Sequence, residues 1–154
     1  ITSGYLPLGA VAVSDRVAET MIERAGEFFH GYTYSGHPLS AAAGLATLDV
    51  YQDDGLFQRA DELAPYWADA VHALKGTRHV IDLRNLGLIA GIELEPRPGK
   101  PGARGFEAFR RCYEQGVLIR VTADIIALSP PLIIEKPEID RIFETIKGVL
   151  DALD

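Results

Sequence analysis

The sequence is poor in cysteine, since Cys112 is the only one among 154 residues. One cysteine cannot form an internal disulfide or build a cysteine-based zinc site, and this usage suits a reducing compartment. The four histidines also lack metal-ligand spacing: His30 and His37 lie seven residues apart, with a glycine-containing turn between them. We therefore expect no metal site.

Clustered basic residues and long apolar runs are missing as well. The net charge is -7 and Arg110-Arg111 is the only adjacent basic pair, which disfavours binding to nucleic acid. No run approaches the roughly 18 apolar residues that span a bilayer, and no signal peptide is visible. A phosphate-binding glycine fingerprint and the GxSxG motif are absent. The composition, 47% hydrophobic and 24% charged, is that of a soluble globular protein, and we expect a cytoplasmic location.

Helices and strands are both indicated, which predicts an α/β fold. Seven apolar residues at helical spacing, from Ile139 to Leu153, predict a C-terminal helix that begins near Pro137. The other expected helices begin at Ser14-Asp15 and span about 38–52, 56–74 and 106–115. The expected strands are Ala10 to Ser14, two within 79–95, 117–121 and 125–129. The helix from Pro38 is apolar nearly all round, so we expect it to be buried at a tight interface.

These elements predict three regions. Residues 1–36 are interpreted as the end of a larger α/β domain, 37–75 as connecting helices and 76–154 as a small C-terminal α/β domain. The first residue is Ile1 rather than Met, and a glycine- and proline-containing turn follows at once. We therefore expect it to be a segment of a longer polypeptide.

Two features, the loop around Thr33 and the strand that carries Arg120, could bind an anion. In "FFHGYTYSGHP", Thr33 lies between Tyr32 and Tyr34, just before a helix whose N-terminus could hold an anion. The same loop could simply be packed by its aromatic rings. In "VLIRV", alternation places Leu118 and Arg120 on the opposite face from the other apolar residues. Arg120 could meet an anionic ligand or a structural carboxylate.

The runs "ITSGYLPLGAVAVSDRV", "HGYTYSGHPLSAAAGLATL", "GLIAGIELE" and "VLIRV…IIALSPPLIIEKPEID" resemble, in order, the C-terminal third of class III aminotransferases. The similarity is closest to the ω-amino acid and β-alanine–pyruvate group. It implies the fold type I architecture of pyridoxal-phosphate enzymes, with the end of the large domain followed by the small domain. It also implies a homodimer or a higher homo-oligomer.

The resemblance also implies roles for three residues. Thr33, assisted by the backbone around Tyr32, would contact the phosphate of pyridoxal 5'-phosphate in the neighbouring subunit. Arg120 would bind a substrate carboxylate and swing aside for an amine. The family often has a Gly-Asp pair after this arginine, whereas this sequence has Ala123 before Asp124. The lysine that forms the Schiff base with the cofactor would precede Ile1, so we expect no catalytic residue within this chain.

The implied reaction moves an amino group from a small ω-amino acid or amine to pyruvate or a similar oxo-acid. The N-terminal remainder of the enzyme would then be a partner of this segment. An aminomutase of the glutamate-semialdehyde type is an alternative within the same class. A non-catalytic dimerisation module is another. A lysine encoded just before Ile1 would favour the enzyme, and an independent start codon the module.

Overall fold

The helices and strands fall into two groups along the chain. The computed structural model describes residues 1–154 and divides into two units, Ile1–Gly55 and Leu56–Asp154. The first unit contains α1 (Asp15–Ala25) and α2 (Pro38–Asp53). The elements of the second unit, in chain order, are α3 (Leu56–His72), β1 (Val80–Leu86), β2 (Ile89–Leu94), α4 (Ala103–Glu114), β3 (Arg120–Thr122), β4 (Ile125–Leu128) and α5 (Lys136–Asp151).

The first unit has little buried surface of its own. Ile1 and Leu8 lie against α2 at Gly44, which is buried, and a Cβ in its place would lie 2.7 Å from Leu8 Cδ2. The helix begins at Pro38, as predicted, and Gly55 follows it with a φ of +59°, a left-handed stop that favours glycine. The apolar side chains of α2 are largely exposed in this chain. Their burial at an interface therefore stays a prediction.

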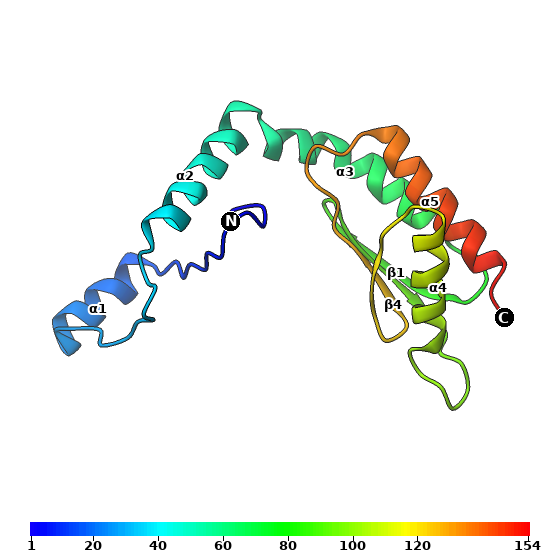
Figure 1. Ribbon diagram of the computed structural model, residues 1–154, viewed down its shortest axis with the longest axis horizontal. Helices are drawn as coiled ribbons and strands as arrows, with labels where there is room; N and C mark the ends of the chain where they lie inside the picture. Colours follow the sequence, from blue (N-terminus) through cyan, green and yellow to red (C-terminus); the bar gives the residue numbers. More distant parts are fainter. The chain divides into compact units, whose positions relative to one another are not determined.

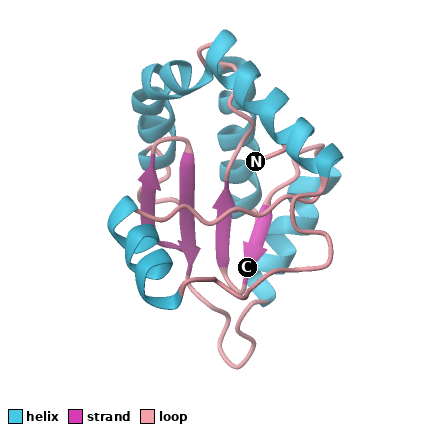
Figure 2. Ribbon diagram, turned by 90° about the vertical axis from the view of Figure 1, so that its left-hand side faces the viewer, coloured by secondary structure: helices cyan, strands magenta, loops and turns pink.

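The second unit is a four-stranded antiparallel sheet covered on one face by helices. The strand order is β1-β2-β4-β3, so β1 and β3 form the two edges. Figure 1 shows α3, α4 and α5 along one face of this sheet, and Figure 2 shows the four strands side by side. Helices cover only one face, and the sheet therefore has an open face.

The core lies between the sheet and these helices. Trp67 on α3 and Phe143 on α5 meet edge to face, with ring centroids 5.1 Å apart. Ile92 at the centre of β2 and Ile146 on α5 are fully buried. Burying such side chains stabilises a fold by about 1.5–3 kcal/mol each. This unit therefore has a hydrophobic core of its own.

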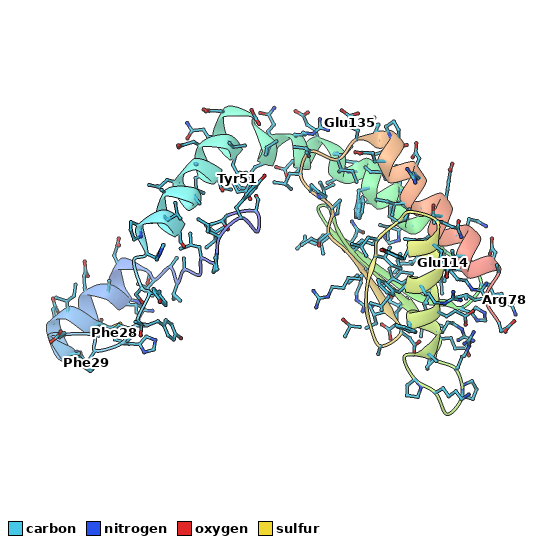
Figure 3. All side chains as sticks on the ribbon, in the orientation of Figure 1. Phe28, Phe29, Tyr51, Arg78, Glu114 and Glu135 are labelled. Carbon is cyan, nitrogen blue, oxygen red and sulfur yellow. The ribbon has the colours of Figure 1, made fainter.

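The C-terminal helix agrees closely with its prediction. Its apolar positions Ile139, Phe143 and Ile146 are all buried, as the helical spacing requires. Glu135 (Figure 3) caps its start, because its N–H donates to Glu138 Oε2 at 2.9 Å while its own carboxylate accepts from the Glu138 N–H. These two bonds satisfy groups that the helix itself leaves free.

One predicted strand is wrong. Ala10 to Ser14 has no regular structure, and Val11 in its middle is 91% exposed. A strand needs a neighbour to accept and donate its backbone hydrogen bonds, and this unit contains no other strand. Two other elements have different bounds from those predicted. The strand predicted at 117–121 is observed as β3, from Arg120 to Thr122, and α4 begins at Ala103 rather than Phe106.

The predicted division into 1–36, 37–75 and 76–154 stays a proposal. Within the second unit, α3 packs against β1 and α5.

None of the helices combines the length and the apolar character needed to cross a membrane. No group of three or more His, Cys, Asp or Glu side chains is placed to hold a metal ion.

Candidate functional site

The loop that carries Thr33 forms a tight turn between α1 and α2. The Ser35 N–H donates to the Tyr32 carbonyl at 2.9 Å, and the Tyr32 N–H donates to Ser35 Oγ at 2.9 Å. These two bonds close the turn and leave Thr33 at its tip. Thr33 is exposed, and neither its hydroxyl nor its N–H makes a hydrogen bond. The turn therefore presents free donors.

The start of α2 lies directly after this turn. Pro38 occupies the first helical position, and His37 Nδ1 accepts from the Ser40 N–H at 3.4 Å. The N-terminus of a helix carries a partial positive charge. A hydroxyl and free N–H groups only a few residues before such a terminus are donors suited to an anion. The predicted phosphate-binding role of Thr33 is thus chemically reasonable, while the N–H of Tyr32 is already engaged by Ser35.

Arg120 is the first residue of β3, at an edge of the sheet. The predicted alternation is confirmed: Val117 and Ile119 are buried, whereas Leu118 is 75% exposed. Arg120 is also exposed, and its guanidinium has no hydrogen bond or ion pair. The sequence raised the possibility of a structural carboxylate for Arg120. None is bound to it in this chain.

A second arginine, Arg84, lies on the same open face of the sheet. Arg120 pairs with Ala127, Ala127 with Gly91 and Gly91 with Arg84, so the four residues form one row across the strands. Residues directly opposite in antiparallel strands point to the same face. The two guanidinium-bearing residues are therefore separated by two small residues.

The two arginines differ in their partners. Arg84 Nη1 donates to Asp82 Oδ2 at 2.5 Å and to Glu93 Oε2 at 2.9 Å. Both hydrogen bonds raise the pKa of Arg84, and the bond to Asp82 contributes more than the bond to Glu93. Its charge is thus already matched by the protein, and Arg120 is the arginine of this row that is free for a ligand. Alternation in β1 was the sequence signal that could have placed Arg84 here.

Arg120 also borders a cavity of about 1060 Å³ that lies wholly within the second unit. Most of its lining is apolar, including Phe106, Leu118 and Ile133, which are exposed. Ser129 adds a hydroxyl, and Glu135 and Glu138 add carboxylates. No lysine lines this cavity.

The loop that forms one wall of the cavity is held by Arg59 on α3. Its guanidinium donates to the carbonyls of Leu132 at 3.3 Å, Ile133 at 3.2 Å and Ile134 at 2.8 Å. Sequence analysis did not identify this role, because the partners lie more than seventy residues away along the chain. Three carbonyl oxygens without local partners become satisfied by one side chain.

Two lysines of α5 have partners of their own. Lys147 Nζ lies 2.7 Å from Asp151 Oδ2, and Lys136 Nζ lies 4.9 Å from the centre of the Tyr66 ring.

The structure places Thr33 and Tyr32 in the first unit and Arg120 in the second. Each is described in its own unit, and their predicted roles toward a cofactor and a substrate stay predictions.

Comparison with known proteins identifies the family. The model of the family "Aminotransferase class-III" matches residues 1–150. An omega-aminotransferase from Caulobacter vibrioides is 59% identical over 157 residues, which cover 100% of this chain and 36% of that protein. The beta-alanine–pyruvate aminotransferase of Pseudomonas aeruginosa is 40% identical, over 99% of this chain and 35% of that protein.

A solved structure agrees with these relatives. It is a thermostable (S)-enantioselective omega-transaminase from Thermomicrobium roseum, 33% identical, with a TM-score of 0.87 over 99% of this chain and 36% of that one. The chain has the fold of the corresponding part of a transaminase. It belongs to the class III aminotransferase family. It spans little more than a third of the length of the curated relatives that it matches.

Proposed function

We propose that this chain is part of a pyridoxal-phosphate-dependent transaminase that moves an amino group from an ω-amino acid or amine to pyruvate or a similar oxo-acid. The names of two relatives, omega-aminotransferase and beta-alanine–pyruvate aminotransferase, support this choice. We further propose that the enzyme is a cytoplasmic homodimer. The observation that carries the proposal is Arg120, a free guanidinium beside an apolar cavity.

The donor chemistry of the Thr33 turn fits a cofactor phosphate. Its hydroxyl and N–H are exposed and unpaired, and they precede the positive end of α2. A phosphate dianion has acceptor oxygens for such donors. Thr33 would therefore hold the phosphate, with the turn fixed in shape by the two bonds between Tyr32 and Ser35.

Arg120 would bind and orient the carboxylate of the substrate. A guanidinium offers a planar fork of donors that matches the two oxygens of a carboxylate. The apolar walls of the cavity would exclude water and strengthen this ion pair. An amine without a carboxylate has no need of the guanidinium and would contact the apolar lining instead.

Pyridoxal phosphate, when bound, would supply an aldehyde that takes up the amino group of the donor and then passes it to the acceptor. The residues of this chain then bind and position, with Thr33 at the phosphate and Arg120 at the substrate. No lysine lines the cavity beside Arg120. We propose that the amine required for covalent catalysis comes from a part of the enzyme outside these 154 residues.

The test replaces Arg120 with alanine in the full-length enzyme. We expect kcat/KM for β-alanine to fall by roughly 10- to 150-fold, as for a lost hydrogen bond to a charged group of about 1.5–3 kcal/mol. The donor half-reaction with benzylamine, which has no carboxylate, should keep its rate. Arg84→Ala is the matched control, because Arg84 is paired with Asp82 and Glu93. Equal losses for both donors in Arg120→Ala would contradict the proposal.

A second test addresses Thr33. Thr33→Ala should weaken cofactor retention by about 1–3 kcal/mol, measured from cofactor absorbance after dialysis. Thr33→Ser keeps the hydroxyl and should retain the cofactor like the unmodified enzyme. Unchanged retention in Thr33→Ala would exclude the phosphate contact.

A further inference from the structure

The position of Arg120 depends on a short hairpin. Arg120 begins β3, which is three residues long and lies at the edge of the sheet, with β4 as its only strand neighbour. Ala123 and Asp124 form the turn between β3 and β4. A strand with one partner is held less firmly than a central one. Contacts at this turn therefore matter for where the guanidinium lies.

Asp124 ties the turn to the start of α4. Its side chain is buried, with Oδ2 accepting from the Gly102 N–H at 2.5 Å and Oδ1 from the Gly105 N–H at 2.9 Å. Gly102 occupies the N-cap position and has no side chain to cap the helix. The carboxylate thus satisfies N–H groups that the helix leaves free, at the end where its dipole favours negative charge.

The backbone of the turn is also fixed at this place. The Asp124 carbonyl accepts from the Leu94 N–H at 2.9 Å, which joins the turn to the end of β2. Ala123 has a φ of +50°, a left-handed conformation that is costly for a residue with a Cβ. A Cβ added to Gly105 would clash with the Ala123 carbonyl oxygen, so the turn lies directly against the backbone of α4.

We infer that Asp124 is a positioning residue for Arg120. By fastening the hairpin to α4, it holds β3, and therefore the guanidinium, where a substrate carboxylate is bound. This inference rests on the proposed function of Arg120. A displacement of about 1 Å in a binding group can lower a rate by roughly 100-fold, so a loosened hairpin would be felt in the reaction of carboxylate substrates.

The test uses Asp124→Ala and Asp124→Asn in the full-length holoenzyme. The donor half-reaction is followed under single turnover by cofactor absorbance, with β-alanine and with benzylamine. We expect Asp124→Ala to raise the half-saturating concentration of β-alanine about tenfold or more, and Asp124→Asn, which keeps one acceptor oxygen, to raise it less. The half-reaction of benzylamine should stay within about twofold of the unmodified enzyme, because it does not use Arg120.

Three controls separate positioning from general destabilisation. Ile146→Val lowers stability in the core of α5, far along the chain from the hairpin, and should leave both donors unaffected. In the Arg120→Ala background, adding Asp124→Asn should cause no further loss with β-alanine, because two residues that act through one interaction are not additive. Ala123→Gly relieves the left-handed strain and should keep the donor preference unchanged.

The outcomes distinguish the two proposals. If Arg120→Ala slows both donors equally, the proposed carboxylate role fails and the inference about Asp124 fails with it. If Arg120→Ala is selective but the Asp124 variants slow both donors equally, or neither, Asp124 has no positioning role and only this inference is overturned. Selective and non-additive losses in the Asp124 variants would establish it. Should Asp124→Ala not fold, Asp124→Asn provides the same comparison.

Discussion

The two units bury their apolar side chains very differently. Every buried apolar side chain that packs into the hydrophobic core belongs to Leu56–Asp154. In Ile1–Gly55, by contrast, Val11 is 91% exposed and Phe29 is 95% exposed. Figure 3 labels Phe29 in this unit. A short chain must bury apolar area to offset the conformational entropy lost on folding. The second unit meets this need by itself, whereas the apolar side chains of the first unit are largely exposed in this chain.

This difference bears on the two predicted sites. Arg120 belongs to a sheet with its own core, where pairing with β4 and the bonds of Asp124 hold its strand. Thr33 belongs to the unit without such a core. Two hydrogen bonds close its turn, and the rings of Tyr32 and Tyr34 contact only His30 and His37 of the same loop. The Thr33 turn is therefore held less firmly by its own unit than Arg120 is held by its unit.

The largest expected effect comes from separating the two units. Residues 56–154 expressed alone should unfold cooperatively and give dispersed amide resonances, because the hydrophobic core lies within them. Residues 1–55 expressed alone should show neither property, since they bury almost no apolar side chain. Circular dichroism during denaturation and two-dimensional NMR provide the measurements. A cooperative transition in residues 1–55 would remove the contrast between the units.

A leucine in each unit sharpens the contrast at single-residue level. Leu150 on α5 is fully buried, and Leu150→Ala should lower the free energy of unfolding by about 2–5 kcal/mol. Leu48 on α2 is 53% exposed, and Leu48→Ala in this chain should change it by about 0.5 kcal/mol or less. In the full-length enzyme Leu48→Ala should cost more if the surface of α2 is covered there. Urea denaturation measures all three values, and a large loss for Leu48→Ala in this chain would contradict the contrast.

Parts of this architecture were predictable because their signals are local. The helical spacing from Ile139 to Leu153 defines α5, and alternation in 117–121 separates the buried from the exposed side chains. The family and the fold were predictable from motifs such as "HGYTYSGHP". Thr33 and Arg120 could be selected from sequence, and their roles stay predictions.

Other parts had no local signal. Asp124 caps α4 across 22 residues of sequence, so the spacing rules for a helix start do not reveal it. Arg59 reaches carbonyls more than seventy residues away for the same reason. The segment Ala10 to Ser14 has the composition of a strand but no partner strand in its unit, and composition alone cannot supply one.

Two glycines of the second unit test how closely it is packed. Gly105→Ala places a Cβ against the Ala123 carbonyl oxygen, which is backbone and cannot move aside, so we expect a loss of about 1–3 kcal/mol. Gly148→Ala on α5 meets nothing within 4 Å and should stabilise by about 0.5–1 kcal/mol through helix propensity. Thermal unfolding of both variants gives the comparison. Similar effects of the two changes would mean that the hairpin and α4 are not in the close contact described.

A pH-dependent effect is expected at Cys112, the only thiol, which lies buried on α4. Burial disfavours the thiolate and raises the pKa of Cys112 from 9.0 to about 11. Because the folded-state pKa lies above that of the unfolded chain, the stabilisation is complete below about pH 9 and is lost as the pH rises toward about 11. At pH 10 this lowers the free energy of unfolding by about 1.4 kcal/mol. Other groups titrate in the same range, so the effect is measured as a difference from Cys112→Ala, whose stability should fall less steeply with pH.

Residues 56–154 alone should show the same difference and should keep the thiol unreactive toward thiol reagents at pH 8. Parallel pH profiles for the two proteins, or rapid labelling of the folded chain, would mean that the core around α4 is open to water.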